Sequence, residues 1–307
     1  MMRFLVAFGL CADILVLMGC GGSSESGPPK VSYDQQIAQA KQEPAPDVRA
    51  KRLTNIGYQQ GRAGDSYGSE ETLKLAAEAC EEITDPATRA SRLALLAEAH
   101  GRLGSASEGR RTIDRALAAA EQIESAEIKA DTLARIARAQ KDVGDTEPAA
   151  KTLKRAETLA DTLEDLSGKV LALGEVAYAY AELGNEAEAG RVVEKSLKLV
   201  EDIEGAQKQC EAIAVIASKQ HAMGREEDAA TTFAEAVERA GTIQDPRVHA
   251  LTLADLAERL SKTGDHRQAH QLLDEADLIA HKIPEPDLQR QTVITVRTLE
   301  GTLPGPE

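Results

Sequence analysis

The chain has 307 residues, with 36 Lys and Arg against 51 Asp and Glu, and therefore carries a formal net charge of −15. Phosphate binding needs a net basic surface, so this balance excludes nucleic acid as a main partner and argues against charge-driven docking on anionic lipid. Hydrophobic residues make up 42% of the chain, but aromatic residues only 3%, and Trp is absent. A core built from Ala, Leu, Ile and Val favours stacked helices over a β-sandwich.

The first residues are typical of a secretory signal, with a basic start at Arg3 and an apolar run over residues 4–18 that Asp13 interrupts. The run closes on Leu17-Met18-Gly19-Cys20, which resembles the bacterial lipobox. The resemblance implies that residues 1–19 are removed and that Cys20 is lipidated. Because Gly21 rather than Asp follows, it also implies an anchor in the outer membrane, at its periplasmic face. An uncleaved membrane anchor is the alternative, although the run is shorter than the about 20 residues that span a bilayer.

Residues 20–45 follow as a linker. Their first part is rich in Gly, Ser and Pro, the composition of a flexible tether. Residues 32–43 are a possible N-terminal cap helix, ended by Pro44 and Pro46.

A period of 40 residues fills residues 46–286. It is marked by a glycine in each copy: Gly64, Gly104, Gly144, Gly184, Gly224 and Gly264. Seven residues before this glycine the chain has only small residues: Gly57, Ala97, Ala137, Ala177, Ala217 and Ala257. Leu, Ile or Val recurs at helical spacing around them, so each copy predicts two amphipathic helices that approach closely at the small residues.

Helix boundaries can be placed within each copy. The repeat glycine predicts a left-handed C-cap for the first helix, and a polar residue after it predicts an N-cap for the second. In the second copy the expected helices are residues 87–103 and roughly 106–124. Residues 287–307 predict a capping helix and tail, because Arg297 replaces the small residue that a following helix would need.

The pattern resembles the tetratricopeptide repeat (TPR). The fourth copy carries it best, with Val176-Ala177, Tyr180, Gly184, Ala189, Val193 and Ser196. The period of 40 exceeds the usual 34 residues, so we expect longer helices or links. The expected fold is all-α, an α-solenoid of about six TPR-like helix hairpins with helical caps. The resemblance implies that the first helices line a concave groove that binds a protein or peptide.

The cysteines and histidines fit the repeat pattern. Cys80 and Cys210 stand in columns of small residues three to four copies apart, so we expect buried thiols and no disulfide between them. His266 and His270 lie one helical turn apart, which is compatible with a surface metal site, but a solvated first turn is the favoured interpretation. No catalytic motif, cofactor site or third metal ligand is evident, so we expect no enzyme, no cofactor and no bound metal.

The expected groove positions include a basic strip at spacings of three: Arg135, Arg138 and Lys141. The hypothesis assigns partner contact to these residues and to Tyr58, Glu175 and Tyr178, and favours an acidic or C-terminal carboxylate peptide. An ordinary solvated helix face is the alternative.

The sequence therefore predicts a non-catalytic, lipid-anchored adaptor or scaffold of the bacterial cell envelope. A structural spacer or self-associating envelope protein is the second interpretation, and a cytoplasmic TPR adaptor the third.

Overall fold

The computed structural model describes residues 31–305, and there the chain forms fourteen α-helices and no strand. A short helix precedes the repeats: α1 (Tyr33–Lys41). The first helices of the six copies are α2 (Pro46–Arg62), α4 (Pro86–Arg102), α6 (Ala126–Asp142), α8 (Leu166–Glu182), α10 (Ala206–Ala222) and α12 (Pro246–Lys262). The second helices are α3 (Ser66–Glu81), α5 (Ala106–Glu121), α7 (Thr146–Asp161), α9 (Glu186–Val200), α11 (Glu226–Ala240) and α13 (His266–Ala280). The last helix is α14 (Pro286–Glu300).

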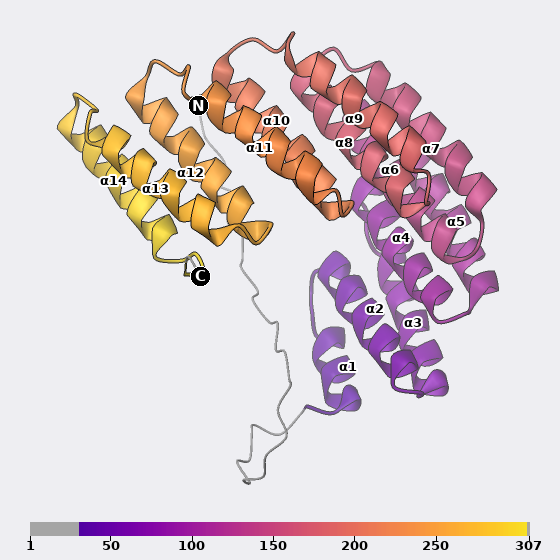
Figure 1. Cartoon of the computed structure of the whole chain (residues 1–307). Helices are drawn as coiled ribbons and strands as arrows, with labels where there is room; N and C mark the ends of the chain where they lie inside the picture. Colours follow the sequence, from indigo (N-terminus) through magenta and orange to yellow (C-terminus); the bar gives the residue numbers. More distant parts are fainter. Residues whose placement is uncertain (1–30, 306–307) are drawn as a thin grey trace.

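The helices follow one another along an open arc from α1 to α14 (Figure 1). Each first helix packs on its own second helix and on the first helix of the next copy. Each second helix packs on its own first helix and on the following first helix. This is an α-solenoid of six TPR-like helix hairpins with a helix at either end, and the predicted fold class is confirmed.

Small side chains set the closeness of the two helices within a copy. The alanines seven residues before the repeat glycines are completely buried: Ala97, Ala137, Ala177, Ala217 and Ala257. Leu, Ile, Val or Phe residues at neighbouring helical positions complete the core, among them Leu133, Leu173 and Phe233. Burial of this apolar face, more than helix propensity, stabilises each helix pair.

The repeat glycines end the first helices as predicted. All six adopt positive φ, from 76° at Gly224 to 94° at Gly264, which only glycine does at low cost. The second helix of the second copy ends at Glu121 rather than near residue 124, a little before the predicted end.

The predicted N-caps are only partly present. The side chains of Asp65, Asn185 and Asp265 accept hydrogen bonds from the helix N-terminus, but those of Ser105 and Asp145 do not. Both carboxylate oxygens of Asp145 instead accept from Arg110 of the preceding second helix, at 2.8–3.0 Å. In the pair with Arg110 both partners are charged and two hydrogen bonds form in parallel, so the link between copies replaces the cap.

The C-terminal helix α14 packs on α12 and α13. Its Val296 is completely buried, whereas Arg297 turns to Asp277 of α13 in a bidentate ion pair. Among the described helices, none has the length and apolar composition needed to cross a membrane. The predicted signal sequence and Cys20 lie outside the described residues.

Candidate functional site

The layer of first helices is the concave side of the array. The first helices pack directly on one another, so this layer is more closely spaced than the layer of second helices, and a curved array places its closely spaced layer inside. The concave face comprises those residues, among the ones 13, 9, 6, 5, 3 and 2 positions before each repeat glycine, that are exposed or half-buried. It contains all six residues of the partner-binding hypothesis: Tyr58, Arg135, Arg138, Lys141, Glu175 and Tyr178.

Tyr178 is the centre of a group that three first helices build. From α6, the Arg138 guanidinium lies over the Tyr178 ring at 4.8 Å from its centroid. From α10, the Lys219 ammonium lies at 5.5 Å from the same centroid. Each cation is attracted by the ring quadrupole, and the aromatic face therefore holds both side chains in place.

Arg138 retains hydrogen-bonding capacity. Its nearest acid, Glu182, is 3.8 Å away, beyond hydrogen-bond distance, and its side chain makes no hydrogen bond within residues 31–305. The side chain is 30% exposed, and a guanidinium carries five donors in a planar fork. The stacked Arg138 is thus positioned to receive a carboxylate.

The other two predicted cations also lie beside acids. Arg135 donates a hydrogen bond to Asp131 at 2.9 Å, whereas Lys141 Nζ is 3.7 Å from Asp142 Oδ1, which is also beyond hydrogen-bond distance. Burial opposes the charge of Arg135, but this hydrogen bond and the charge of Glu175 outweigh it and raise the pKa of its guanidinium. The sequence reasoning did not identify these acids, although the i,i+4 spacing of Asp131 and Arg135 predicts such a pair.

Glu175 is paired with Lys219 at 2.6 Å, from one first helix to the next. Lys219 is the member of the site that the sequence reasoning missed. Its column contains Ala in three other copies and Gln59 and Arg259 in the remaining two, so the column by itself did not single out Lys219. Arg135, Arg138, Glu175 and Tyr178 therefore come together with Lys219, whereas the ion pair of Lys141 is with Asp142 of its own helix.

Tyr58 lies apart from this group, in α2. It lines a shallow hollow of about 190 Å³ with Leu95, Glu98 and Arg102 of α4. The Arg62 guanidinium is 6.0 Å from its ring centroid. Tyr58 and Tyr178 thus mark two places on the concave face, and each is accompanied by a cation.

A larger hollow, about 560 Å³, lies away from the concave face, against α7. Its floor includes Leu133 and Leu159, and Lys129 and Arg155 on its rim both pair with Glu121. Because its rim cations already have acid partners, we favour the concave face over this hollow as the candidate site.

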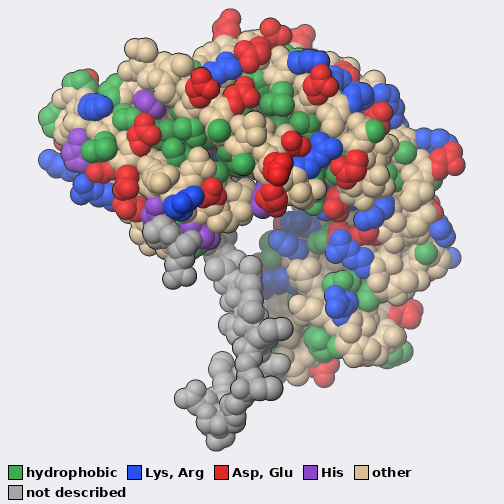
Figure 2. Space-filling model, viewed as in Figure 1, with side chains coloured by type: hydrophobic (Ala, Val, Ile, Leu, Met, Phe, Trp, Pro, Cys, Tyr) green, Lys and Arg blue, Asp and Glu red, His purple; other side chains and the backbone are tan. Residues whose placement is uncertain are grey.

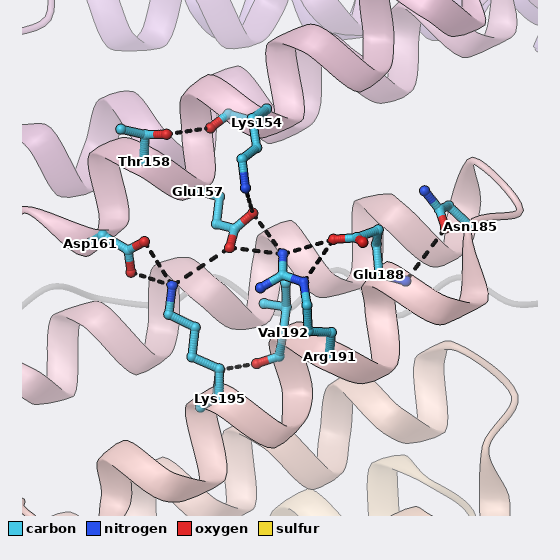
Figure 3. A network of polar contacts seen from close by, with 10 residues as sticks. Lys154, Glu157, Thr158, Asp161, Asn185, Glu188, Arg191, Val192 and Lys195 are labelled. Atoms are coloured by element: carbon cyan, nitrogen blue, oxygen red, sulfur yellow. Dashed lines mark hydrogen bonds and ion pairs between the residues drawn. The ribbon is translucent and has the colours of Figure 1, made fainter.

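A polar network ties α7 to α9 on the convex side (Figure 3). Glu157 has a side chain that is only 3% exposed, and Arg191 of α9 donates to both of its oxygens at 2.8 and 2.9 Å. Lys154 and Lys195 approach the same carboxylate at 3.2 and 3.5 Å. Burial by itself raises the pKa of Glu157, but the hydrogen bonds from Arg191 and Lys154 hold it below its usual range.

Two cysteines and two histidines singled out in the sequence, Cys80, Cys210, His266 and His270, occupy buried or hydrogen-bonded positions. Cys80 and Cys210 are buried free thiols, and burial raises the pKa of each to about 11. His266 Nδ1 lies 3.1 Å from Ser261 Oγ, and His270 Nε2 lies 2.9 Å from the Pro304 carbonyl oxygen. Histidines gather over the C-terminal helices in Figure 2, yet no cluster of three metal-ligating side chains occurs within residues 31–305.

Fold and site together define a TPR-like α-solenoid with a polar, aromatic concave face. Comparisons with known proteins found no matching family model and no matching curated protein. Among solved structures, Ton1535 from Thermococcus onnurineus NA1 has 13% identity and a TM-score of 0.42, over 87% of this chain and 96% of its own.

Two further solved structures are similar to the chain. The TPR-like repeats of a putative kinesin light chain from Podosopora anserina have 18% identity and a TM-score of 0.34, over 66% of this chain and 98% of their own. A Rap protein complexed with competence and sporulation factor has 17% identity and a TM-score of 0.35, over 88% of this chain and 82% of its own.

Proposed function

We propose that the chain is a non-catalytic adaptor that binds an acidic protein segment on its concave face. One observation carries this proposal: Arg138 is stacked on Tyr178, is partly exposed and has unfilled hydrogen-bond donors. A rigid aromatic ring and a preoriented guanidinium are the side chains that most often dominate protein interfaces. Arg135 and Lys219 flank this centre.

The proposal includes the place where the adaptor works. The lipobox resemblance at Leu17-Met18-Gly19-Cys20 supports a lipid anchor at Cys20 and a position in the bacterial cell envelope. We expect Cys20→Ala to abolish labelling by a fatty-acid analogue and to release the protein from the membrane fraction. Retention of both properties would remove the anchor from the proposal and leave the concave face untouched.

The test of the adaptor is a capture experiment from detergent-solubilised envelopes, read by mass spectrometry. The test variant is Arg135→Ala/Arg138→Ala/Tyr178→Ala. The matched control, Tyr67→Ala/Arg111→Ala/Lys198→Ala, removes one Tyr and two cations from the second helices, where these side chains are highly exposed.

A partner retained by wild type and control but lost by the test variant supports the adaptor. Equal recovery by all three folded proteins, or recovery of the bait alone, contradicts it and favours the spacer interpretation. Circular dichroism of each variant shows whether the solenoid is intact.

A further inference from the structure

The charges of the concave face are unevenly distributed along the array. The half built by α2, α4 and α6 has six cations, namely Lys51, Arg62, Arg102, Arg135, Arg138 and Lys141, against three anions, namely Glu98, Asp131 and Asp142. The half built by α8, α10 and α12 has three cations, namely Lys219, Arg259 and Lys262, against five anions, namely Glu175, Glu182, Glu211, Asp255 and Glu258. The first half is therefore net positive and the second net negative.

Ion pairing neutralises most of these charges within their own half. Arg259 pairs with Asp255 and Lys262 with Glu258 in the second half, and Arg102 pairs with Glu98 and Arg135 with Asp131 in the first. In the part of the chain that the structure describes, Lys51 and Arg62 of α2 join no ion pair. Glu211 of α10 likewise has no cationic partner and contacts only the amide of Gln207.

The uncompensated charges are far enough apart to act separately. Adjacent packed helices lie about 8–10 Å apart, so α2 and α10 are separated by roughly 30–40 Å of groove. The Debye length at physiological ionic strength is about 8 Å. A bound segment therefore meets a positive field at the α2 end and a negative field at the α10 end, independently of each other.

The middle of the face is different again. Leu171 of α8 is 42% exposed, and Val215 of α10 is half-buried on the same face. Apolar surface of this kind binds through burial and has no preference for the sign of charge.

Resting on the proposed function, we infer that the partner is a protein segment acidic at one end, apolar in its middle and basic at the other end. The segment lies along the groove with its acidic end on α2, α4 and α6 and its basic end on α10 and α12. Complementary charge fixes the direction of such a segment more than it raises the affinity.

The test uses a synthetic probe of about 20 residues, with a Glu-rich first third, a Leu-containing middle and a Lys-rich last third, and a fluorescence donor on its acidic end. The acceptor is placed on Ala63→Cys at the end of α2 or on Ala222→Cys at the end of α10, in a full-length chain with Cys11→Ser and Cys20→Ser. Cys80 and Cys210 are buried, so the introduced thiol is the one labelled. Binding is measured by anisotropy and orientation by energy transfer.

We expect higher transfer to the Ala63→Cys label than to the Ala222→Cys label. We also expect Lys51→Glu/Arg62→Glu to weaken binding by about tenfold and to reduce the difference between the two labels. The exposed pair Arg111→Glu/Lys198→Glu is the matched control, since it makes the same charge change on the convex side and should leave binding unchanged.

The outcomes separate the two proposals. Binding with equal transfer to both labels, or no effect of the α2 variant, overturns the charge direction and leaves the binding groove standing. Absence of binding at 100 µM probe and low salt, in every variant, overturns the proposed function together with it.

Discussion

At the residue scale, the buried carboxylate of Glu157 forms ion pairs with three cations. Glu157 occupies a column that holds Ala, Leu or Val in four of the other copies, so it places a charge where the array otherwise packs apolar side chains. A buried charge persists only when it is paired and hydrogen-bonded, and Arg191, Lys154 and Lys195 provide this. The same carboxylate therefore fixes α7 against α9 and depends on those partners for its own burial.

We expect Glu157→Gln to destabilise the protein by about 1.5–3 kcal/mol, the usual contribution of hydrogen bonds to a charged group. The variant should also lose part of the pH dependence of stability. The pKa of Glu157 is lowered in the folded state, so its contribution is present above the unfolded-state pKa of about 4.3 and is lost as the pH falls through the lower folded value. Urea unfolding at pH 7 and at pH 3 measures this, and an equal loss at both values would contradict it.

The thiols provide a second prediction at this scale. Because burial raises the pKa of Cys80 and Cys210 to about 11, almost no thiolate forms at pH 8. We expect neither residue to react with a thiol reagent in the native protein, and both to react in urea. Peptide-resolved mass spectrometry of the labelled chain reads each cysteine separately, and rapid native labelling of either would show that its repeat opens readily.

At the scale of the element, glycines inside the first helices have unequal surroundings. A Cβ added to Gly101 of α4 would lie 2.5 Å from the backbone carbonyl of Asp142, at the end of α6. A Cβ added to Gly174 of α8 would meet its nearest atom, Cγ of Lys219, at 3.6 Å, an ordinary contact. Gly101 therefore permits a close approach of α4 and α6, whereas no backbone approaches α8 closely at Gly174.

Substitution by Ala should therefore have opposite effects on stability at these two glycines. Gly101→Ala should destabilise the protein by about 1–3 kcal/mol, because a backbone has to move. Gly174→Ala should stabilise it by about 0.5–1 kcal/mol through better helix propensity. Chemical denaturation of the two variants side by side measures both, and a stabilising effect at Gly101 would show that α4 and α6 are not so closely packed.

The elements were largely predictable from the sequence, and the site only in part. The 40-residue period places the helix pairs, because small residues and cap glycines recur at fixed positions whatever the rest of the copy contains. The surroundings of Arg138 were not predictable in the same way, since Tyr178, Glu182 and Lys219 come from helices other than α6 and their distances depend on the curvature. A period reports which residues share a face, but not how far apart neighbouring copies place them.

At the scale of the whole molecule, each copy of the repeat is held by the copies beside it. Arginine side chains of one second helix form ion pairs with acids of the previous second helix, as Arg115 does with Glu81 and Arg191 with Glu157. Stability is then close to a sum of local terms, and distant copies unfold with some independence.

We therefore expect Val296→Asp, which buries a charge under the last helix, to open the C-terminal end alone. Hydrogen exchange should accelerate in α12, α13 and α14 and stay unchanged in α2, α4 and α6. Uniform acceleration along the chain would show that the array unfolds as one cooperative unit. Ile294, which is 58% exposed on the same helix, offers Ile294→Asp as a control that should leave exchange nearly unchanged.

Because these contacts are local, the number of copies can also change during evolution. Since consecutive copies are all 40 residues long and every junction joins the same types of helix, a duplication or loss of 40 codons would add or remove one copy without disturbing either end helix. The distance between the positive and negative regions of the groove would change by about one helix spacing each time. Evolution can thus change the length of the segment that this protein accommodates in steps of one copy.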